Sequence, residues 1–120
     1  MADRDPTYQA DCLFCRIAAG EIPADRVFED ESVIVFRDIN PKAPTHVLAI
    51  PRRHLASAAD LTDADGDLLA ALFSALRRAA EQAGLNGYRI VSNVGAESGQ
   101  SVFHLHFHLL GGRPMPWPPD

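Results

Sequence analysis

Three histidines alternate with apolar residues near the end of the chain, at His104, His106 and His108, with Leu105 and Phe107 between them. Successive side chains of a β-strand point to opposite faces of its sheet. The spacing therefore predicts a strand that buries its apolar row and lines a surface with imidazoles about 6.5–7 Å apart. Imidazole can act as nucleophile, acid, base or metal ligand near neutral pH. The row therefore predicts a reaction centre.

Two other interpretations of the histidine row are open. The row can be the solvated face of an edge strand, although the glycine-flanked loop at 95–101 beside it favours a site. It can also be a catalytic zinc site with three histidine ligands. Zinc needs each nitrogen about 2.0–2.1 Å away, whereas the outer two histidines of a straight strand are about 13 Å apart. One strand therefore offers at most two of the three ligands.

The composition is that of one globular domain. The chain has 120 residues, of which 47% are hydrophobic and 22% charged, and its formal net charge is −5. This acidic balance argues against nucleic acid or an anionic membrane surface as a partner, whereas a small phosphate ligand needs only a local group of donors. No apolar run approaches the roughly 20 residues of a transmembrane helix. The absence of a signal-peptide core and the two closely spaced cysteines predict a cytoplasmic protein.

The order of the expected elements predicts an α+β fold built on a five-stranded antiparallel sheet. We expect residues 1–10 to form a flexible segment and residues 11–120 a single domain. A short helix capped by Asp11 is expected over 12–19, and one long helix over 62–83, where Thr62 and Asp65 have the spacing of a capping box. The five expected strands are 26–29, 32–37, 46–50, 88–93 and 102–110.

Three segments of the chain together resemble the histidine-triad (HIT) superfamily. They are DINPKAPTH at 38–46, GQSVFHLHFHLL at 99–110 and GGRPMPWPP at 111–119. The Trp-Pro-Pro tail narrows the resemblance to the HINT branch, the histidine-triad nucleotide-binding proteins. The resemblance covers nearly the whole chain, from Asp11 to Pro119. It implies a homodimer in which two five-stranded sheets join into one ten-stranded sheet.

The resemblance also implies an activity, the hydrolysis of purine nucleoside phosphoramidates and related mixed phosphoanhydrides, with release of a nucleoside monophosphate. The resemblance further implies that this catalysis requires no cofactor. His106 is then the nucleophile, and its covalent nucleotidyl-imidazole intermediate is cleaved by water. The other residues implied for catalysis are His46, His104, His108 and Ser101. The residues implied for nucleotide binding are Asp38 at the ribose; Asn93, Gly99, Gln100 and Ser101 at the phosphate or leaving group; Phe14, Ile17, Ile22, Phe36, Ile39 and Leu48 around the base; and Trp117 over the partner subunit's site.

This chemistry has physical requirements that lead to further expectations. An imidazole attacks phosphorus well only if its second nitrogen is held as a donor, so we expect a carbonyl or hydroxyl beside His106. Backbone N–H groups of residues 99–101 and a cationic His108 are expected to stabilise the charge of the transition state. Ser101 or a histidine is expected to supply the proton that the leaving amine takes up.

Most of these residues also have a purely structural interpretation. Asp38 and Asn93 are common turn residues, Ser101 and His46 can simply begin strands, and Trp117 is favoured at any subunit interface. The six apolar residues around the base pack a core by default. A base pocket is itself apolar, so core and pocket are compatible interpretations.

Cys12 and Cys15 form a Cys-x-x-Cys motif for which three interpretations are open. A redox pair of the thioredoxin type follows a strand, and none is expected here. The two thiols can be inert and buried. They can also hold structural zinc with His54 and His104, since some bacterial members of the superfamily look similar at these positions. Zinc would make His104 a structural ligand, and activity is expected not to require it.

Two other functions stand beside the phosphoramidate hydrolase. One is a nucleotide-binding regulatory or scaffold protein whose hydrolysis is incidental, for which slow turnover with tightly retained nucleoside monophosphate is the expected sign. The other is a metal-dependent hydrolase, which requires that a strong chelator abolish the rate.

Overall fold

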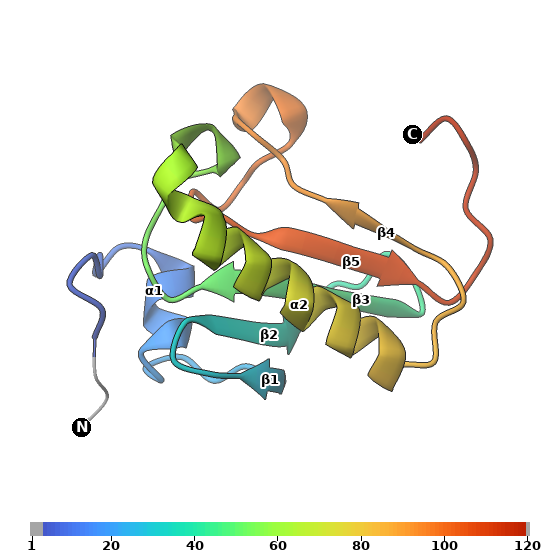
Figure 1. Ribbon diagram of the computed structural model, residues 1–120, viewed down its shortest axis with the longest axis horizontal. Helices are drawn as coiled ribbons and strands as arrows, with labels where there is room; N and C mark the ends of the chain where they lie inside the picture. The colour runs from blue at the N-terminus through green and yellow to red at the C-terminus, as the bar shows by residue number, and fades with distance from the viewer. Residues whose placement is uncertain (1–3, 120) are drawn as a thin grey trace.

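The computed structural model describes residues 4–119 and contains one five-stranded antiparallel sheet and two helices (Figure 1). The elements are α1 (Leu13–Ala18), β1 (Arg26–Glu29), β2 (Val33–Arg37), β3 (Thr45–Pro51), α2 (Gly66–Gln82), β4 (Tyr88–Val91) and β5 (Phe107–Gly111), with 3-10 turns η1 (Ala58–Asp60), η2 (Asp63–Asp65) and η3 (Ala96–Ser98). The strands lie in the order β1-β2-β3-β5-β4, and every neighbouring pair is antiparallel. The predicted α+β class is confirmed. Among the described residues, no helix is long and apolar enough to cross a membrane.

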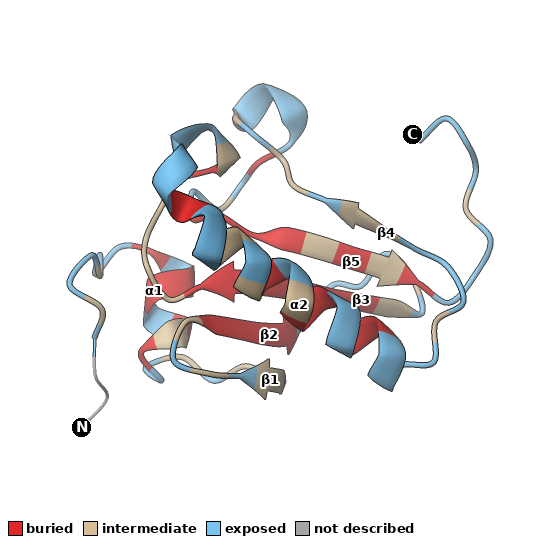
Figure 2. Ribbon diagram, viewed as in Figure 1, coloured by how far each residue is buried: buried red, intermediate tan, exposed pale blue. Residues whose placement is uncertain are grey.

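The sheet separates two apolar layers, because alternate residues of each strand face opposite sides. In β2, Val33 and Val35 pack on the α2 side, whereas Ile34 and Phe36 pack on the α1 side. All four are at most 4% exposed, as expected for a strand covered on both faces. Figures 1 and 2 show α2 across one face of the sheet, with its buried residues turned toward the strands. The histidines of the predicted reaction centre lie on the opposite face, where Phe14 packs against His104 and His106.

The helix starts differ by a few residues from those expected. Asp11 does not cap α1, because the Cys12 side chain accepts the Cys15 N–H at 3.3 Å. The expected capping box at Thr62 and Asp65 is present, but it closes η2, and α2 begins only at Gly66. The Asp65 carboxylate accepts the Thr62 N–H at 2.8 Å and an Arg53 guanidinium N–H at 2.6 Å, and these donors lower its pKa.

The histidine strand is shorter than expected, and this corrects a central prediction. We expected residues 102–110 to be extended, but β5 begins at Phe107, so His104 and His106 precede it in irregular backbone. The physical reason is that this backbone has partners outside the sheet. The Leu105 N–H donates to the Leu55 carbonyl at 2.6 Å, and the Ser92 hydroxyl donates to the His106 carbonyl at 2.9 Å. Strict alternation therefore does not position the three imidazoles.

Residues 4–10, expected to be flexible, make specific contacts with the rest of the chain. Arg4 pairs with the Glu21 carboxylate, to which the Tyr8 hydroxyl also donates at 2.6 Å. The His54 N–H donates to the Thr7 hydroxyl at 2.6 Å. The flexibility of residues 4–10 stays a prediction, and residues 1–3 lie outside the described part of the chain.

Candidate active site and metal site

The His106 ring is oriented by one backbone carbonyl. Its Nδ1 lies 2.7 Å from the His104 carbonyl oxygen, so Nδ1 carries the proton and Nε2 carries the lone pair. The ring is buried against the edges of Phe14 and His108, each with its ring centroid 5.1 Å away. In residues 4–119, every side-chain nitrogen that is fully buried has a hydrogen-bond partner. Nε2 of His106 has no hydrogen-bond partner in these residues, so this atom is not fully buried and reaches solvent. A neutral imidazole with an accessible lone pair is a nucleophile.

A second pair of imidazoles is oriented by a backbone N–H group. The Lys42 N–H donates to Nδ1 of His46 at 3.0 Å, so the neutral His46 ring carries its proton on Nε2. That proton is donated to Nδ1 of His108, 2.9 Å away. Neutral His108 therefore carries its own proton on Nε2. The chain of donors runs in one direction and leaves His108 with one N–H group free to donate.

Asp38 stands next to this pair. Its Oδ2 lies 3.4 Å from Nε2 of His46, and its Oδ1 accepts the Asn40 N–H at 2.8 Å. The carboxylate is therefore fixed both as a turn former and as a charge beside the imidazoles. Asp38, His46 and His108 also have the spacing of a metal cluster. The separation of the two ring nitrogens is that of a hydrogen bond, however, and is shorter than the edge of about 3.3 Å that a zinc tetrahedron requires.

Burial keeps these imidazoles neutral in the free protein. Burial, as the main cause, lowers the pKa of His108 to about 4. Charge repulsion from His106 and His46 contributes to the same decrease. Burial also lowers the pKa values of His106 and His46, and the negative charge of the Asp38 carboxylate partly offsets this decrease. The expected cationic His108 is therefore not the resting form. An anion bound beside the ring would raise this pKa again.

The residues expected around a base mostly come together. Phe14, Ile17, Phe36 and Leu48 belong to one buried cluster on the histidine face, and Ile22 packs against it. This cluster is adjacent to the histidines, because Leu48 pairs with His108 in the register of β3 and β5. Ile39 is separate from the cluster and fully exposed.

The loop before β5 uses most of its polar groups on itself. The Gly99 N–H donates to the Ala96 carbonyl and the Gln100 N–H to the Gly95 carbonyl. We expected these two donors to bind a phosphate, but in this structure they are already used within the loop. The Gln100 side chain is buried and bridges the Gly95 N–H and the Ala56 carbonyl. Asn93 likewise donates to the carbonyl of Ser98 at 2.7 Å. The Ser101 hydroxyl and N–H have no hydrogen bond within residues 4–119, so this loop offers them to a ligand.

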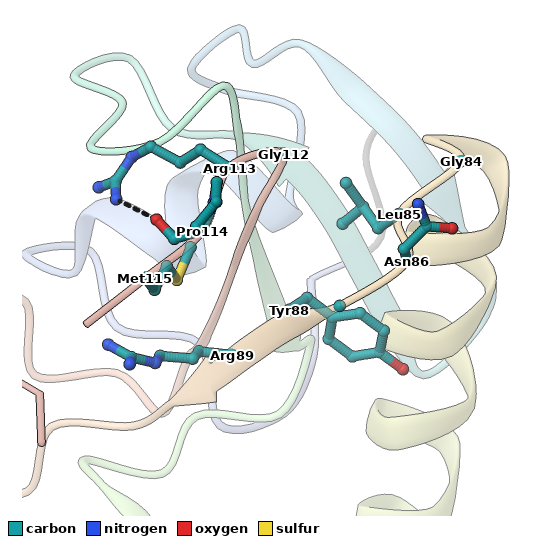
Figure 3. Close-up of a pocket in the computed structure, with 10 residues that line it drawn as sticks. Gly84, Leu85, Asn86, Tyr88, Arg89, Gly112, Arg113, Pro114 and Met115 are labelled. Carbon is teal, nitrogen blue, oxygen red and sulfur yellow. Dashed lines mark hydrogen bonds between the residues drawn. The ribbon is translucent and has the colours of Figure 1, made fainter. Parts of the chain in front are cut away.

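Trp117 lies in the exposed tail and is 81% exposed, with the Arg89 guanidinium 6.0 Å from its ring centroid. A cavity of about 600 Å³ separates this tail from the segment 84–89 (Figure 3). Among residues 4–119, Arg89 and Arg113 line it, but no histidine or carboxylate does. The geometry of the imidazoles, and not cavity size, therefore identifies the candidate reaction centre.

The two cysteines of the Cys-x-x-Cys motif lie beside both histidines predicted as zinc ligands, His54 and His104. Nδ1 of His104 lies 3.3 Å from Sγ of Cys12 and 3.6 Å from Sγ of Cys15. Nδ1 of His54 lies 3.4 Å from Sγ of Cys15 and 3.2 Å from Nδ1 of His104. A zinc tetrahedron with two sulfur and two nitrogen ligands has edges of about 3.3–3.8 Å. The spacing of these four side chains fits a structural zinc ion.

The protonation of the cluster agrees with its geometry. Nε2 of His104 donates to the Pro51 carbonyl at 2.8 Å, so the lone pair is on Nδ1, which faces the sulfur atoms. Burial lowers the pKa of His104 to about 4 and so keeps it neutral, as a ligand must be. Burial also raises the pKa of the Cys15 thiol to about 11, which a metal ion would reverse.

The sheet carries a candidate histidine-based reaction centre beside a Cys/His cluster whose spacing fits zinc. The family model described as scavenger mRNA decapping enzyme C-term binding matches residues 11–117. A HIT family hydrolase from Legionella pneumophila is 53% identical and superposes with a TM-score of 0.89, over 92% of this chain and 100% of that one. An uncharacterized HIT-like protein of Synechococcus elongatus is 46% identical over 110 residues, which are 91% of this chain and 96% of the relative. A 14 kDa zinc-binding protein of Zea mays is 47% identical over 110 residues, 89% of this chain and 86% of the relative. The chain belongs to the histidine-triad (HIT) family.

Some groups that shape the site were not predicted. The donors and acceptors that orient the rings are the Lys42 N–H and the His104 and Pro51 carbonyls. Backbone groups carry no side-chain signal in a sequence. The Ser92 hydroxyl, which holds the His106 carbonyl, was also missed, and a serine at the end of a strand gives no distinctive pattern.

Proposed function

We propose that the protein is a nucleotide hydrolase of the HINT branch that acts on purine nucleoside phosphoramidates through a covalent intermediate on His106. The observation that carries this proposal is the hydrogen bond of 2.7 Å between Nδ1 of His106 and the His104 carbonyl. It holds the proton on Nδ1 and leaves Nε2 as an accessible nucleophile.

The proposed reaction has two steps. In the first, Nε2 of His106 forms a bond to phosphorus as the phosphorus–nitrogen bond of the substrate breaks, and the leaving amine takes a proton from water or through the Ser101 hydroxyl. The intermediate keeps its Nδ1 proton, so its imidazole is cationic and leaves readily. In the second step, a water oxygen forms a bond to phosphorus as the bond from phosphorus to Nε2 of His106 breaks, which releases the nucleoside monophosphate, returns neutral His106 and gives one proton of the water to solvent. The N–H group of His108 donates to the phosphoryl oxygens in both steps.

The remaining site residues have supporting roles in this proposal. Asp38 binds the ribose hydroxyls, and the apolar cluster of Phe14, Ile17, Phe36 and Leu48, with Ile22 beside it, holds the purine. Ser101 meets the phosphate or leaving group, while Asn93, Gly99 and Gln100 act mainly by holding the loop. His46 orients His108.

A homodimer belongs to the same proposal. β4 lies at an edge of the sheet, and its Tyr88 and Val91 side chains are exposed, so a second copy can pair along it and extend the sheet to ten strands. The exposed Trp117 then lies in a tail that can reach the partner subunit's site.

The test is an adenosine phosphoramidate assay with His106→Ala and His106→Asn. We expect both variants to lose at least about 10³-fold in kcat, because they lack the nucleophile. Rapid denaturation of wild type at alkaline pH, where a nucleotidyl-imidazole bond survives, should give a protein mass increased by one nucleotidyl group, and neither variant should form it. Arg77→Ala, on the exposed side of α2, is the control. Undiminished turnover of both His106 variants would refute the proposal.

One observation favours a second function, nucleotide binding with incidental hydrolysis. The Gly99 and Gln100 N–H groups already donate within the loop, and burial keeps His108 neutral. The site therefore offers few hydrogen-bond donors and no histidine cation to stabilise the charge of a transition state. Slow turnover of wild type with tightly retained AMP would favour this role over a dedicated hydrolase. Complete loss of rate with a chelator would instead favour a metal-dependent hydrolase.

A further inference from the structure

The metal cluster and the candidate nucleotide site share one residue. The His104 ring belongs to the cluster through Nδ1, while the carbonyl of the same residue orients His106 at 2.7 Å. The ring is completely buried. Anything that holds or releases the His104 ring therefore also holds or releases the acceptor for the Nδ1 proton of His106.

The two sites also share a helix. The short α1 and its cap place Cys12 and Cys15 in the cluster, and between them Phe14 on the nucleotide side. The Phe14 ring packs edge-on against His106 at 5.1 Å and against His104 at 5.9 Å. A helix of six residues is too short to be stable alone, so α1 depends on its side-chain contacts for its position.

We infer that α1 and His104 couple the Cys/His cluster to the nucleotide site, so that an occupied cluster tightens nucleotide binding and fixes the His106 ring. This inference rests on the proposed function, since it assumes that His106 and Phe14 meet a nucleotide. It goes beyond a stabilising role, in which the metal ion would raise the melting temperature without changing the site. It assigns His104 and Phe14 as positioning residues.

The coupling has a quantitative consequence. If Zn²⁺ raises the affinity for AMP by some factor, AMP must raise the affinity for Zn²⁺ by the same factor. Measured couplings between sites begin at about fivefold, so we expect the Kd for AMP to fall about fivefold or more when the chelated protein is loaded with Zn²⁺. The affinity for Zn²⁺ should rise equally in saturating AMP.

The experiment is calorimetric titration of the full chain with AMP, chelated and loaded with Zn²⁺, at a temperature where circular dichroism shows both forms folded. Cys15→Ala removes one sulfur ligand, and Zn²⁺ should leave its Kd for AMP unchanged. Leu13→Ala is the matched control on the exposed side of the same helix, and it should respond to Zn²⁺ as wild type does.

A measurement without nucleotide separates this inference from the proposed function. The exchange rate of the His106 Nδ1 proton, followed by NMR, should be about fivefold or more lower in the loaded protein. Equal exchange rates in the two forms, or equal Kd values for AMP despite a raised melting temperature, would overturn the coupling. If AMP binds neither form, the proposed function fails, and the exchange rate alone decides the coupling.

Discussion

At the scale of single residues, the direction of the hydrogen bonds matters more than the number of histidines. A backbone N–H group cannot accept, so the Lys42 N–H fixes the proton of His46 on Nε2 and thereby that of His108 on its own Nε2. The His104 carbonyl cannot donate, so it fixes His106 in the opposite tautomer. Two backbone groups thus give neighbouring imidazoles opposite tautomers, one with a lone pair on Nε2 and one with a proton on Nε2.

A substitution at His46 tests this chain of donors. His46→Ala should lower kcat about 10–100-fold with little change in KM, because His108 loses the donor that sets its tautomer. His46→Gln should recover part of the loss, since its amide N–H group can donate to Nδ1 of His108. Steady-state kinetics with adenosine phosphoramidate measures both values. Equal defects in the two variants would show that His46 acts in another way.

The lowered pKa of His108 predicts a pH dependence of stability. The unfolded chain binds a proton at this histidine below about pH 6.5, but the folded protein does so only near pH 4. Between these values the unfolded state carries more protons, so stability falls as the pH drops through this window. We expect His108→Asn to lose less stability than wild type between pH 7 and pH 5 in urea denaturation. Parallel losses in both proteins would contradict this.

The sequence predicted the types of these residues, but not their orientation. The spacing of the histidines indicated a reaction centre and the Cys-x-x-Cys motif indicated its two histidine partners, because both signals consist of side chains. The tautomers depend on backbone groups of residues 42, 51 and 104. Every residue type has a backbone carbonyl, and every type except proline has a backbone N–H, so these groups leave no signal in the sequence.

At the scale of elements, the site is built where regular structure stops. β5 begins only at Phe107, and residues 101–106 bond to a loop and to Ser92 instead of a neighbouring strand. Periodicity cannot reveal this boundary, since His104 and His106 continue the apolar alternation without interruption. The long helix and β2 were predicted well, because their apolar patterns are long and are covered by many neighbours.

The loop before β5 depends on one backbone conformation. Gly99 has φ +95°, which a residue with a side chain adopts only with strain, although no atom nearer than 3.7 Å would meet the new Cβ. We expect Gly99→Ala to lower the free energy of unfolding by about 1–2 kcal/mol. Gly87→Ala is the matched control, since its φ is not positive and its Cβ meets nothing within 4 Å. Chemical denaturation measures both, and equal values would argue against strain at Gly99.

At the scale of the whole molecule, the two edges of the sheet differ. β1 carries Glu29, which pairs with Arg26 and Arg52, whereas β4 exposes Tyr88 and Val91. Charges on an edge strand oppose pairing with another sheet, and apolar side chains favour it. We therefore expect the predicted homodimer to pair along β4 and not along β1.

A charge at the β4 edge tests the dimer. Val91→Lys should shift the protein toward monomers in sedimentation velocity, because it places an ammonium group in the proposed seam. Glu29→Gln changes the net charge by the same amount at the opposite edge and should leave the assembly unchanged. A monomeric wild type, or a dimer insensitive to Val91→Lys, would remove β4 as the interface.

The position of β5 in the sheet has a consequence for biosynthesis. β5 is the last strand in the sequence, yet it lies between β3 and β4, where it is the second partner of β3 and the partner of the edge strand β4. On the ribosome, β1, β2 and β3 can pair as soon as they emerge, but β3 keeps an open hydrogen-bonding edge until residues 107–111 have been translated. A nascent chain stalled before that point would expose this edge, and would have neither its core completed nor its histidines assembled.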